Sequence, residues 1–182
     1  MSIGLKKGTV AVEPHRMEWE ESAQEMIARL KNICKDDLAD AQHIGSTSIK
    51  SICAKPVVDI VAGVSSFDRI MKHNDDLKNH GIVYRRQDQP GQHLYVVGDS
   101  ENQVQTHYIH VVIWKQEAWN NYINMRDYLN VHEEEAKKYA ELKERLAREY
   151  PQDRIAYTNG KSACIARILR MADEWRSKTR GV

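Results

Sequence analysis

Residues 56–62 read Pro-Val-Val-Asp-Ile-Val-Ala, a short and almost wholly apolar run in which β-branched side chains predominate. Such a run is typical of a strand that is buried on both faces, so we expect a central strand here, ended by Gly63. Asp59 is its one charged residue, and a carboxylate inside an apolar strand is costly unless it meets a cation, a metal ion or hydrogen-bond donors. Asp59 therefore needs a partner, which is either a functional ligand or a salt bridge, for example to Lys55 or Lys161.

A glycine followed by three hydroxyl side chains precedes this strand. Residues 43–48 read His-Ile-Gly-Ser-Thr-Ser, and Asp59 follows Ser46 by thirteen residues. Glycine lets the backbone approach a ligand closely, and hydroxyl groups such as those of Ser46 and Thr47 donate hydrogen bonds to phosphate oxygens. The same residue types also build ordinary turns and helix caps. The short connection to the strand that carries Asp59 favours a phosphate-binding turn at Gly45.

Hydrophobic spacing predicts the remaining elements. We expect helices near residues 18–31 and 67–80, strands at 82–85, 93–97 and 106–114, and three helices after residue 116, which contain residues 119–129, 136–146 and 165–172. Turn residues near 88–91 and 98–100 make the three strands an antiparallel meander. The fold class is therefore α/β (α+β), a mixed and partly antiparallel sheet covered by helices with a helical C-terminal third. Residues 1–182 should form a single domain.

Composition excludes several classes of function. Lys and Arg number 27 against 26 for Asp and Glu, so a net charge of +1 provides no broad positive field for duplex nucleic acid or an anionic membrane. No apolar stretch follows Lys6 and Lys7, and no window reaches membrane-spanning length, so we expect a cytoplasmic protein. The three cysteines are far apart and odd in number, which indicates reduced and mostly buried thiols at Cys34, Cys53 and Cys164.

The segment at residues 43–48, followed by Ala-Lys-Pro-Val-Val-Asp-Ile at 54–60, closely resembles the signature of the GrpB family. The similarity covers roughly residues 19–168 and includes segments at 106–111, 126–129, 139–143 and 157–161. That family resembles the nucleotidyltransferase superfamily in fold, and its domain also occurs fused to dephospho-CoA kinase. The resemblance therefore implies a sheet of the nucleotidyltransferase type. It also implies a nucleotide or a coenzyme A precursor as the small-molecule partner.

The superfamily pattern implies roles for individual residues. In that superfamily a Gly-Ser turn positions a nucleoside triphosphate, and acidic residues on neighbouring strands hold two divalent ions that clamp the attacking and leaving oxygens. Carried over, the turn lies at Gly45, Ser46 and Thr47. The first metal-binding carboxylate is Asp59, and the metal would be Mg²⁺ or Mn²⁺.

This sequence departs from the superfamily pattern at the other acids. The second acid would lie two residues after Asp59, where this chain has Val61, and the later strand offers His107 and His110 but no carboxylate. Successive residues of a strand face opposite sides, so His110 and His107 point away from each other and we expect only His110 to join Asp59. One aspartate and one histidine bind a divalent ion weakly and favour softer metals than magnesium. The alternative for both histidines is a hydrogen-bonded polar residue in a half-buried strand.

Charged residues elsewhere suggest further roles. Lys161 follows Asn159-Gly160 at the start of the last helix, where the helix dipole favours an anion, and it matches the lysine of the Tyr-x-x-x-Lys pattern of the family. Arg126 and Asp127 suit a local ion pair that fixes helix packing. Residues 48–52 lack the Pro-Gly of the family signature, and Lys50 there is expected to be exposed.

The leading hypothesis is a nucleotidyltransferase-like protein that binds a nucleotide or a related phosphorylated cofactor at Gly45, Ser46, Asp59, His110 and Lys161. If the protein is an enzyme, Asp59 and His110 would hold the metal and Ser46 the triphosphate, while a nucleotidyl group moves to a small acceptor. The alternative is a non-catalytic ligand-binding or interaction module that lost the second carboxylate. The oligomeric state stays open.

Overall fold

The computed structural model describes residues 3–180, apart from the side chains of Asp88, Gln89 and Arg180; residues 1–2 and 181–182, at the ends of the predicted domain, lie outside the described residues. The described strands are β1 (Leu5–Lys6), β2 (Asp40–Ile44), β3 (Val58–Val64), β4 (Ile82–Gln89), β5 (Gln92–Asp99) and β6 (Val104–Ile113). The described helices are α1 (Met17–Cys34), α2 (Phe67–Met71), α3 (Asn74–Asn79), α4 (Glu117–Val131), α5 (Glu133–Glu149), α6 (Arg154–Gly160) and α7 (Ser162–Arg180). Two short 3-10 turns, η1 (Lys35–Asp37) and η2 (Ser46–Ser48), flank β2.

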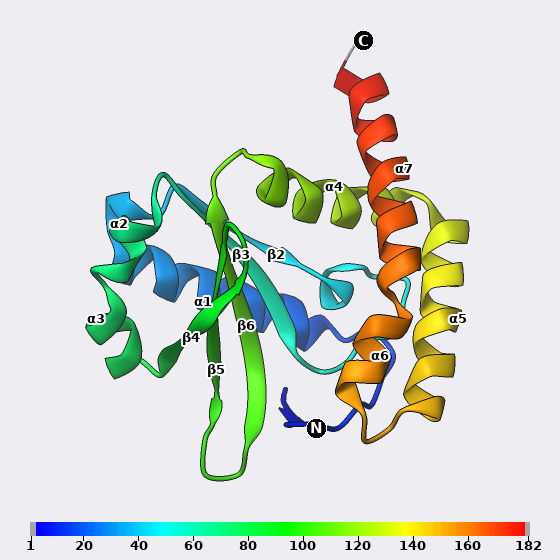
Figure 1. Cartoon of the computed structure of the whole chain (residues 1–182), viewed down its shortest axis with the longest axis horizontal. Coiled ribbons are helices and arrows are strands. Elements are labelled where there is room, and N and C mark those ends of the chain that lie inside the picture. Colours follow the sequence, from blue (N-terminus) through cyan, green and yellow to red (C-terminus); the bar gives the residue numbers. More distant parts are fainter. Residues whose placement is uncertain (1–2, 181–182) are drawn as a thin grey trace.

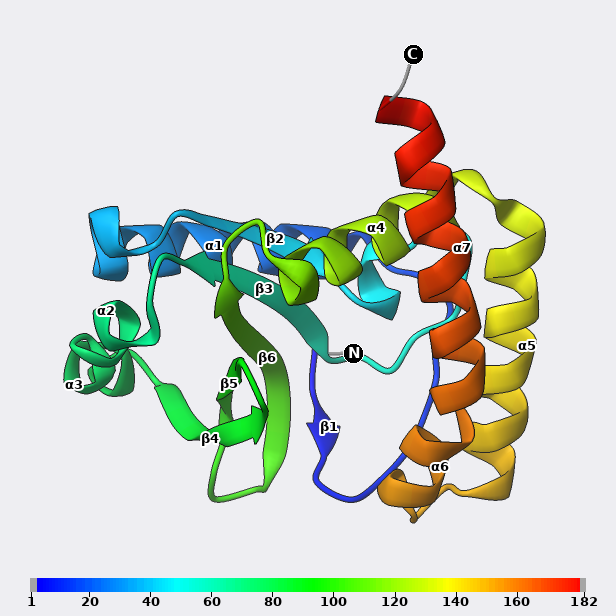
Figure 2. The ribbon, with the colours of Figure 1, turned by 45° about the horizontal axis from the view of Figure 1, so that its top comes forward.

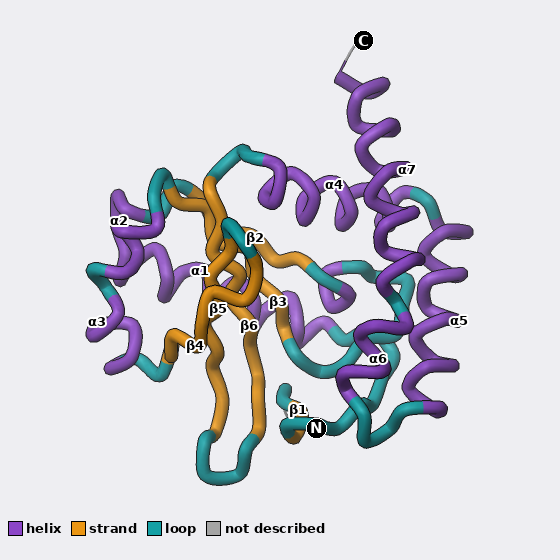
Figure 3. Tube along the Cα trace, viewed as in Figure 1, coloured by secondary structure: helices purple, strands orange, loops and turns teal. Residues whose placement is uncertain are grey.

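The strands form one mixed sheet in the order β2-β3-β6-β5-β4, with the short β1 beside β6. β3 and β6 run parallel, whereas the other pairs are antiparallel. Figure 3 shows the strands as one layer with helices around it. The fold class, the central position of β3 and the meander of β4 to β6 are therefore confirmed.

The two faces of the sheet have different surroundings. On one face, which we call the sealed face, Ile60, Ile109 and Tyr95 pack in a large apolar cluster with side chains of α1, α2 and α3. The opposite face, which we call the cavity face, carries Asp59 and Tyr108 as directly paired neighbours. Because side chains alternate along a strand, this division follows from the register of β3 against β6.

The C-terminal helices stand beside the cavity face. Figure 1 shows α5, α6 and α7 together on the side of the sheet away from α2 and α3, and Figure 2 shows the same separation after rotation. Ile49 and Ile52, which follow the predicted phosphate turn, are buried in an apolar cluster with Tyr128 of α4, Tyr139 of α5 and Ile168 of α7. The helical third therefore anchors the turn against the sheet. None of the helices among residues 3–180 is both long enough and apolar enough to cross a membrane.

Several predicted boundaries need correction. Gly63 does not end the strand, because β3 continues to Val64. A Cβ atom at Gly63 would lie 2.7 Å from Trp114 Cδ1, so this glycine permits a close approach inside the strand. The helix predicted at residues 67–80 is two short helices, and the break coincides with His73, whose Nε2 lies 3.0 Å from the Asp37 carboxylate. β2 and α6 were not predicted.

Candidate functional site

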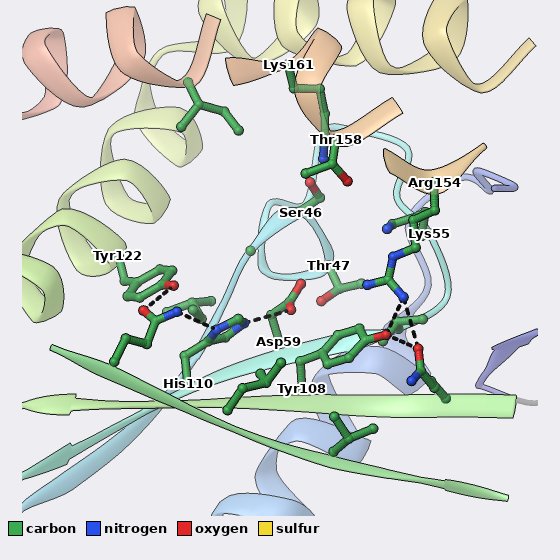
Figure 4. A pocket seen from close by; sticks show the side chains of 18 of the residues that line it. Ser46, Thr47, Lys55, Asp59, Tyr108, His110, Tyr122, Arg154, Thr158 and Lys161 are labelled. Atoms are coloured by element: carbon green, nitrogen blue, oxygen red, sulfur yellow. Dashed lines mark hydrogen bonds and ion pairs between the residues drawn. The ribbon is translucent and has the colours of Figure 1, made fainter. Parts of the chain in front are cut away.

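A cavity of about 1220 Å³ opens between the cavity face, the turn after β2 and the helices α4, α6 and α7. Figure 4 shows Asp59 and His110 near its centre, with Lys55, Arg154 and Lys161 on one side and Tyr122 on the other. Its lining contains every residue predicted for the site: Gly45, Ser46, Thr47, Asp59, His110 and Lys161. The structure therefore brings together segments that lie more than a hundred residues apart.

The turn at Gly45 is shaped by Asp59. Gly45 has φ of +71°, and a Cβ atom there would lie only 2.6 Å from Asp59 Oδ2. Both the backbone conformation and the lack of space require glycine. Ser48 Oγ donates to the Gly45 carbonyl at 2.7 Å and closes the turn. The turn and the carboxylate are thus in direct contact.

The hydroxyl groups of the turn differ in availability. Ser46 is half-buried and lines the cavity. Thr47 is buried, and its Oγ1 lies 2.8 Å from Nε2 of His43 in a hydrogen bond. Burial lowers the pKa of His43 to about 4, so this histidine is neutral. Ser46, which also hydrogen-bonds with Tyr139, is therefore the more accessible hydroxyl for a ligand, while Thr47 holds the turn to β2.

Asp59 is paired with His110 rather than with a lysine. His110 Nε2 lies 3.2 Å from Asp59 Oδ1, and the two side chains are 17% and 31% exposed. Burial opposes ionisation of Asp59, but the hydrogen bond with His110 and the charges of Lys55 and Lys161 outweigh it and hold the pKa of this carboxyl below its usual range. The salt bridge predicted to Lys55 or Lys161 is not among the ion pairs of the described residues. The charges of the two lysines lower the pKa of Asp59 without a direct ion pair.

A chain of hydrogen bonds continues from His110. The Tyr122 hydroxyl donates to Gln92 Oε1 at 2.8 Å, and Gln92 Nε2 lies 3.4 Å from His110 Nδ1. An amide nitrogen only donates, so Nδ1 of His110 is the acceptor and its Nε2–H donates to Asp59. Gln92 and Tyr122 were missed from the sequence. Neither stands in a recognisable motif, although Gln92 follows the predicted turn.

Three cations converge on the other side of Asp59. Lys55 comes from the loop before β3, Arg154 from the start of α6, and Lys161 from the junction of α6 with α7. The Nζ atoms of Lys55 and Lys161 lie 5.2 and 4.5 Å from the ring centroid of Tyr157. Burial lowers the pKa of Lys55 to about 7 and that of Lys161 to about 8, and neighbouring cations add to both shifts. Three cationic side chains therefore lie near a single carboxylate, that of Asp59, so positive charge is in excess here.

Arg154 is oriented by the cavity face. Its Nη1 donates to Gln105 Oε1 at 2.9 Å and to the Tyr108 hydroxyl at 2.6 Å. The guanidinium also lies 4.9 Å from the centroid of the Tyr108 ring. The sequence did not identify Arg154, because α6 itself was not predicted.

The position expected for a second metal-binding acid is closed. Val61 is 0% exposed and packs with Ile44, Val112 and Trp119 in an apolar cluster beneath α4. Val61 therefore lies on the cavity face but outside the cavity lining. Among residues 3–180 there is no group of three or more His, Cys, Asp or Glu side chains that could hold a metal ion. The donor set does not fit a pair of divalent ions.

His107 lies on the sealed face, as predicted. It is buried, with Nε2 3.0 Å from Ser22 Oγ of α1 and Nδ1 2.9 Å from Thr106 Oγ1. Burial lowers its pKa to about 4. His107 is therefore the hydrogen-bonded polar residue of the alternative interpretation, whereas His110 joins Asp59.

The remaining predicted charges have structural contacts. Arg126 pairs with Asp127 at 2.8 Å, and Arg126 Nη1 also donates to Gln42 Oε1 at 2.7 Å, so the pair ties α4 to β2. Asp127 also pairs with Arg176 of α7. Lys50 is exposed, as predicted, and lies 3.8 Å from Glu20. The three cysteines are free; Cys34 is buried, but the other two are only half-buried.

Solved structures share this fold. The crystal structure of the conserved protein GrpB from Enterococcus faecalis superposes with a TM-score of 0.83 at 25% identity and covers 91% of this chain and 99% of that chain. The poly(U) polymerase Cid1 superposes with a TM-score of 0.53 at 11% identity, over 75% of this chain and 43% of Cid1. The likeness to Cid1 is one of fold, and it confirms the sheet of the nucleotidyltransferase type.

Sequence comparison leads to the family. The glutamate-rich protein GrpB of Alkalihalophilus pseudofirmus is 36% identical over 170 residues, which cover 92% of this chain and 98% of that protein. The UPF0157 protein YqkA of Bacillus subtilis is 29% identical, and the match spans 93% of this chain and 49% of YqkA. The family model for GrpB protein matches residues 9–171. This chain therefore belongs to the GrpB family.

Proposed function

We propose that this protein binds a nucleotide or a related phosphorylated cofactor in the cavity. The observation that carries the proposal is the charge of the lining. Seven basic residues and a single acidic one, Asp59, line the cavity among the described residues, a formal charge of +6, whereas the whole chain carries +1. A concave site with charge of one sign attracts and holds ligands of the opposite sign.

The phosphates would lie between the turn and the three cations. Lys161 and Ser46 face each other across this part of the cavity (Figure 4). Phosphate oxygens accept charge-assisted hydrogen bonds from lysine and arginine, which are about twice as strong as neutral ones. A bound anion would also favour the protonated forms of Lys55 and Lys161, whose pKa values burial lowers in the free protein.

The rest of the ligand would lie toward α4 and α7. Tyr122 and Met125 of α4 and Leu169 of α7 line this part of the cavity. Apolar and aromatic surface beside a few polar groups suits the ring of a base or the organic part of a cofactor. The cavity thus offers one charged end and one apolar end.

Nucleotidyl transfer to a small acceptor is a second proposal. It is favoured by the contact of Asp59 with the Gly45 turn in a fold shared with Cid1. In this proposal an oxygen of the acceptor attacks the α-phosphorus and pyrophosphate leaves; Asp59 and His110 would hold a single Mg²⁺ or Mn²⁺ ion, as predicted from the sequence, which would stabilise the developing negative charge. A non-catalytic binding module would bind the same ligand without forming pyrophosphate.

Thermal unfolding with each nucleoside triphosphate and with a phosphorylated coenzyme A precursor tests binding. A ligand at about 100 times its Kd should add about 2.7 kcal/mol to the free energy of unfolding. Lys161→Gln should reduce this stabilisation, whereas the exposed control Lys50→Gln should not. If none of these ligands shifts the wild-type transition, the binding proposal is wrong. Pyrophosphate release then separates transfer from binding, and competition between the two ligand classes tests for one shared site.

A further inference from the structure

Among the described residues, the lining of the cavity contains several cations and a single carboxylate, and this composition decides whether a ligand there needs a divalent cation to bind. We propose that the cavity binds the polyphosphate of its ligand without a divalent cation, and that Lys55, Arg154 and Lys161 supply the countercharge. This inference rests on the proposed function and deepens it. It departs from the two-metal arrangement that the fold implies.

The carboxylates that would hold metal ions are missing for a packing reason. Asp59 is the one acidic side chain among the described residues of the lining. Val61, two residues further along β3, is covered by Trp119 of α4 and has no exposed surface. A carboxylate at that position would be buried in apolar surroundings and would not reach the cavity. Magnesium is usually held by one or two carboxylates together with substrate phosphates and waters, and this lining supplies a single carboxylate, which His110 already engages.

His110 is held in a state that does not favour metal binding. Gln92 donates to its Nδ1, and its Nε2–H points to Asp59, so neither ring nitrogen presents a free lone pair. The same Nε2–H group occupies Oδ1 of Asp59. Binding of a metal ion by this pair would require loss of the chain that begins at Tyr122.

The three cations stand where a metal ion would otherwise neutralise phosphate. Lys55 and Lys161 both act electrostatically on Asp59, and Arg154 acts on both lysines, so all four charges share one region. Among the ion pairs of the described residues, none joins Lys55, Arg154 or Lys161 to a carboxylate. Three cations without a carboxylate partner would offset much of the charge of a triphosphate tail.

Isothermal titration with inorganic tripolyphosphate and with ATP, each in excess EDTA and in excess Mg²⁺, tests this inference. We expect both probes to bind in EDTA, and Mg²⁺ to weaken binding because it neutralises the polyanion. Lys55→Gln and Lys161→Gln should each weaken binding in EDTA by about tenfold or more. Lys50→Gln, which alters an exposed lysine outside the cavity, is the matched control and should bind as the wild type does.

Asp59→Asn should change ligand affinity in opposite directions in a metal-free site and in a metal-dependent site. Without a metal, removal of a negative charge beside the phosphates should tighten binding by about threefold or more. In a metal-dependent site the same substitution abolishes binding, and that result would overturn the inference, provided that circular dichroism shows a folded variant. Binding only with Mg²⁺ or Mn²⁺ would also overturn it but leave the proposed function standing. If neither probe binds under either condition, both proposals fall.

Discussion

Two histidines three residues apart on β6 show how the faces of one sheet differ. His107 lies on the sealed face, hydrogen-bonded to Ser22 and Thr106, and burial holds its pKa near 4. His110 lies on the cavity face and pairs with Asp59. The residue type is the same, but the strand face decides whether it supports packing or a ligand site. Motif similarity alone would assign either histidine to the site.

The cavity face is itself divided. Over Asp59, Tyr108 and His110 it is open to the cavity, whereas over Val61 and Val112 it is closed by Trp119. The open part bears polar and charged groups at a cost in stability, which is common at functional sites. The boundary between the two parts lies two residues from Asp59, where the superfamily pattern has its second acid.

The largest expected effect comes from a carboxylate placed at Val61, on the closed side of this boundary. Val61→Asp should lower the free energy of unfolding by about 3 kcal/mol or more, because it buries a carboxylate among apolar side chains. Urea unfolding measures the loss, and Val61→Asn separates the cost of charge from that of polarity. If Val61→Asp is as stable as the wild type and Mn²⁺ stabilises it further, the position is open to a metal and our description of the boundary is wrong.

A smaller effect, measured as the difference between two glycine variants, tests the contact between the turn and Asp59. Gly45→Ala and Gly81→Ala both place alanine at positive φ, +71° and +75°, but only the former meets Asp59 Oδ2, at 2.6 Å. Each should lose about 1–2 kcal/mol for the left-handed backbone. Gly45→Ala should lose about 2 kcal/mol more and should also weaken ligand binding. Equal losses in chemical denaturation would show that Asp59 can move away from the turn.

The difference between the two faces of the sheet could largely be predicted from the sequence, because it depends on the two-residue period of side chains along a strand. The alternation along residues 106–111 placed His107 and His110 on opposite faces, and the apolar run around Asp59 gave the central strand. Lys161 was predicted from its place at the start of the last helix, but its meeting with Lys55 and Arg154 could not be predicted from the sequence. Arg154 and Lys55 are separated by about a hundred residues, and their meeting depends on how α6 packs, which no local pattern encodes.

Other failures have local causes. β2 was overlooked because His43 and Ile44 were interpreted as part of the phosphate turn, although they also end a strand. Gly63 looked like a strand end because glycine usually interrupts strands, whereas here it makes room for Trp114. The closure over Val61 required knowledge of where α4 lies. The sequence could show that the second acid is missing but not that its place is filled.

Substitution of the two histidines should have crossed effects. His107→Ala should lose about 1–3 kcal/mol of stability, because it leaves buried hydroxyl partners unsatisfied, and should leave ligand affinity unchanged. His110→Ala should lose about 1 kcal/mol or less and should change ligand affinity, because Asp59 and Gln92 lose their shared partner. Unfolding and ligand titration on both variants provide the readout. If both substitutions affect the same property, the faces are not functionally separate.

A further effect is expected in the pH dependence of stability, because buried histidines and buried lysines titrate over different pH ranges. Burial lowers the pKa of His43 and His107 to about 4, so the unfolded chain binds more protons below its histidine pKa of about 6.5, and stability falls from there toward pH 4. Lys55 and Lys161 have pKa values of about 7 and 8, below the unfolded value of about 10.4.

The unfolded chain therefore binds more protons than the folded one above pH 7, and the ligand-free protein should become more stable from pH 7 to pH 9. A bound polyphosphate favours the charged lysines, so its stabilising effect should shrink over the same range.

Lys143, 1% exposed and bonded to the Cys53 carbonyl, also has a pKa lowered by burial to about 7. Because Lys143 is outside the cavity lining, Lys143→Met should reduce the ligand-free gain but leave the ligand-linked change intact. If instead the ligand effect is constant from pH 7 to 9, neither Lys55 nor Lys161 titrates on binding, and the charge that holds the phosphates comes from the arginines.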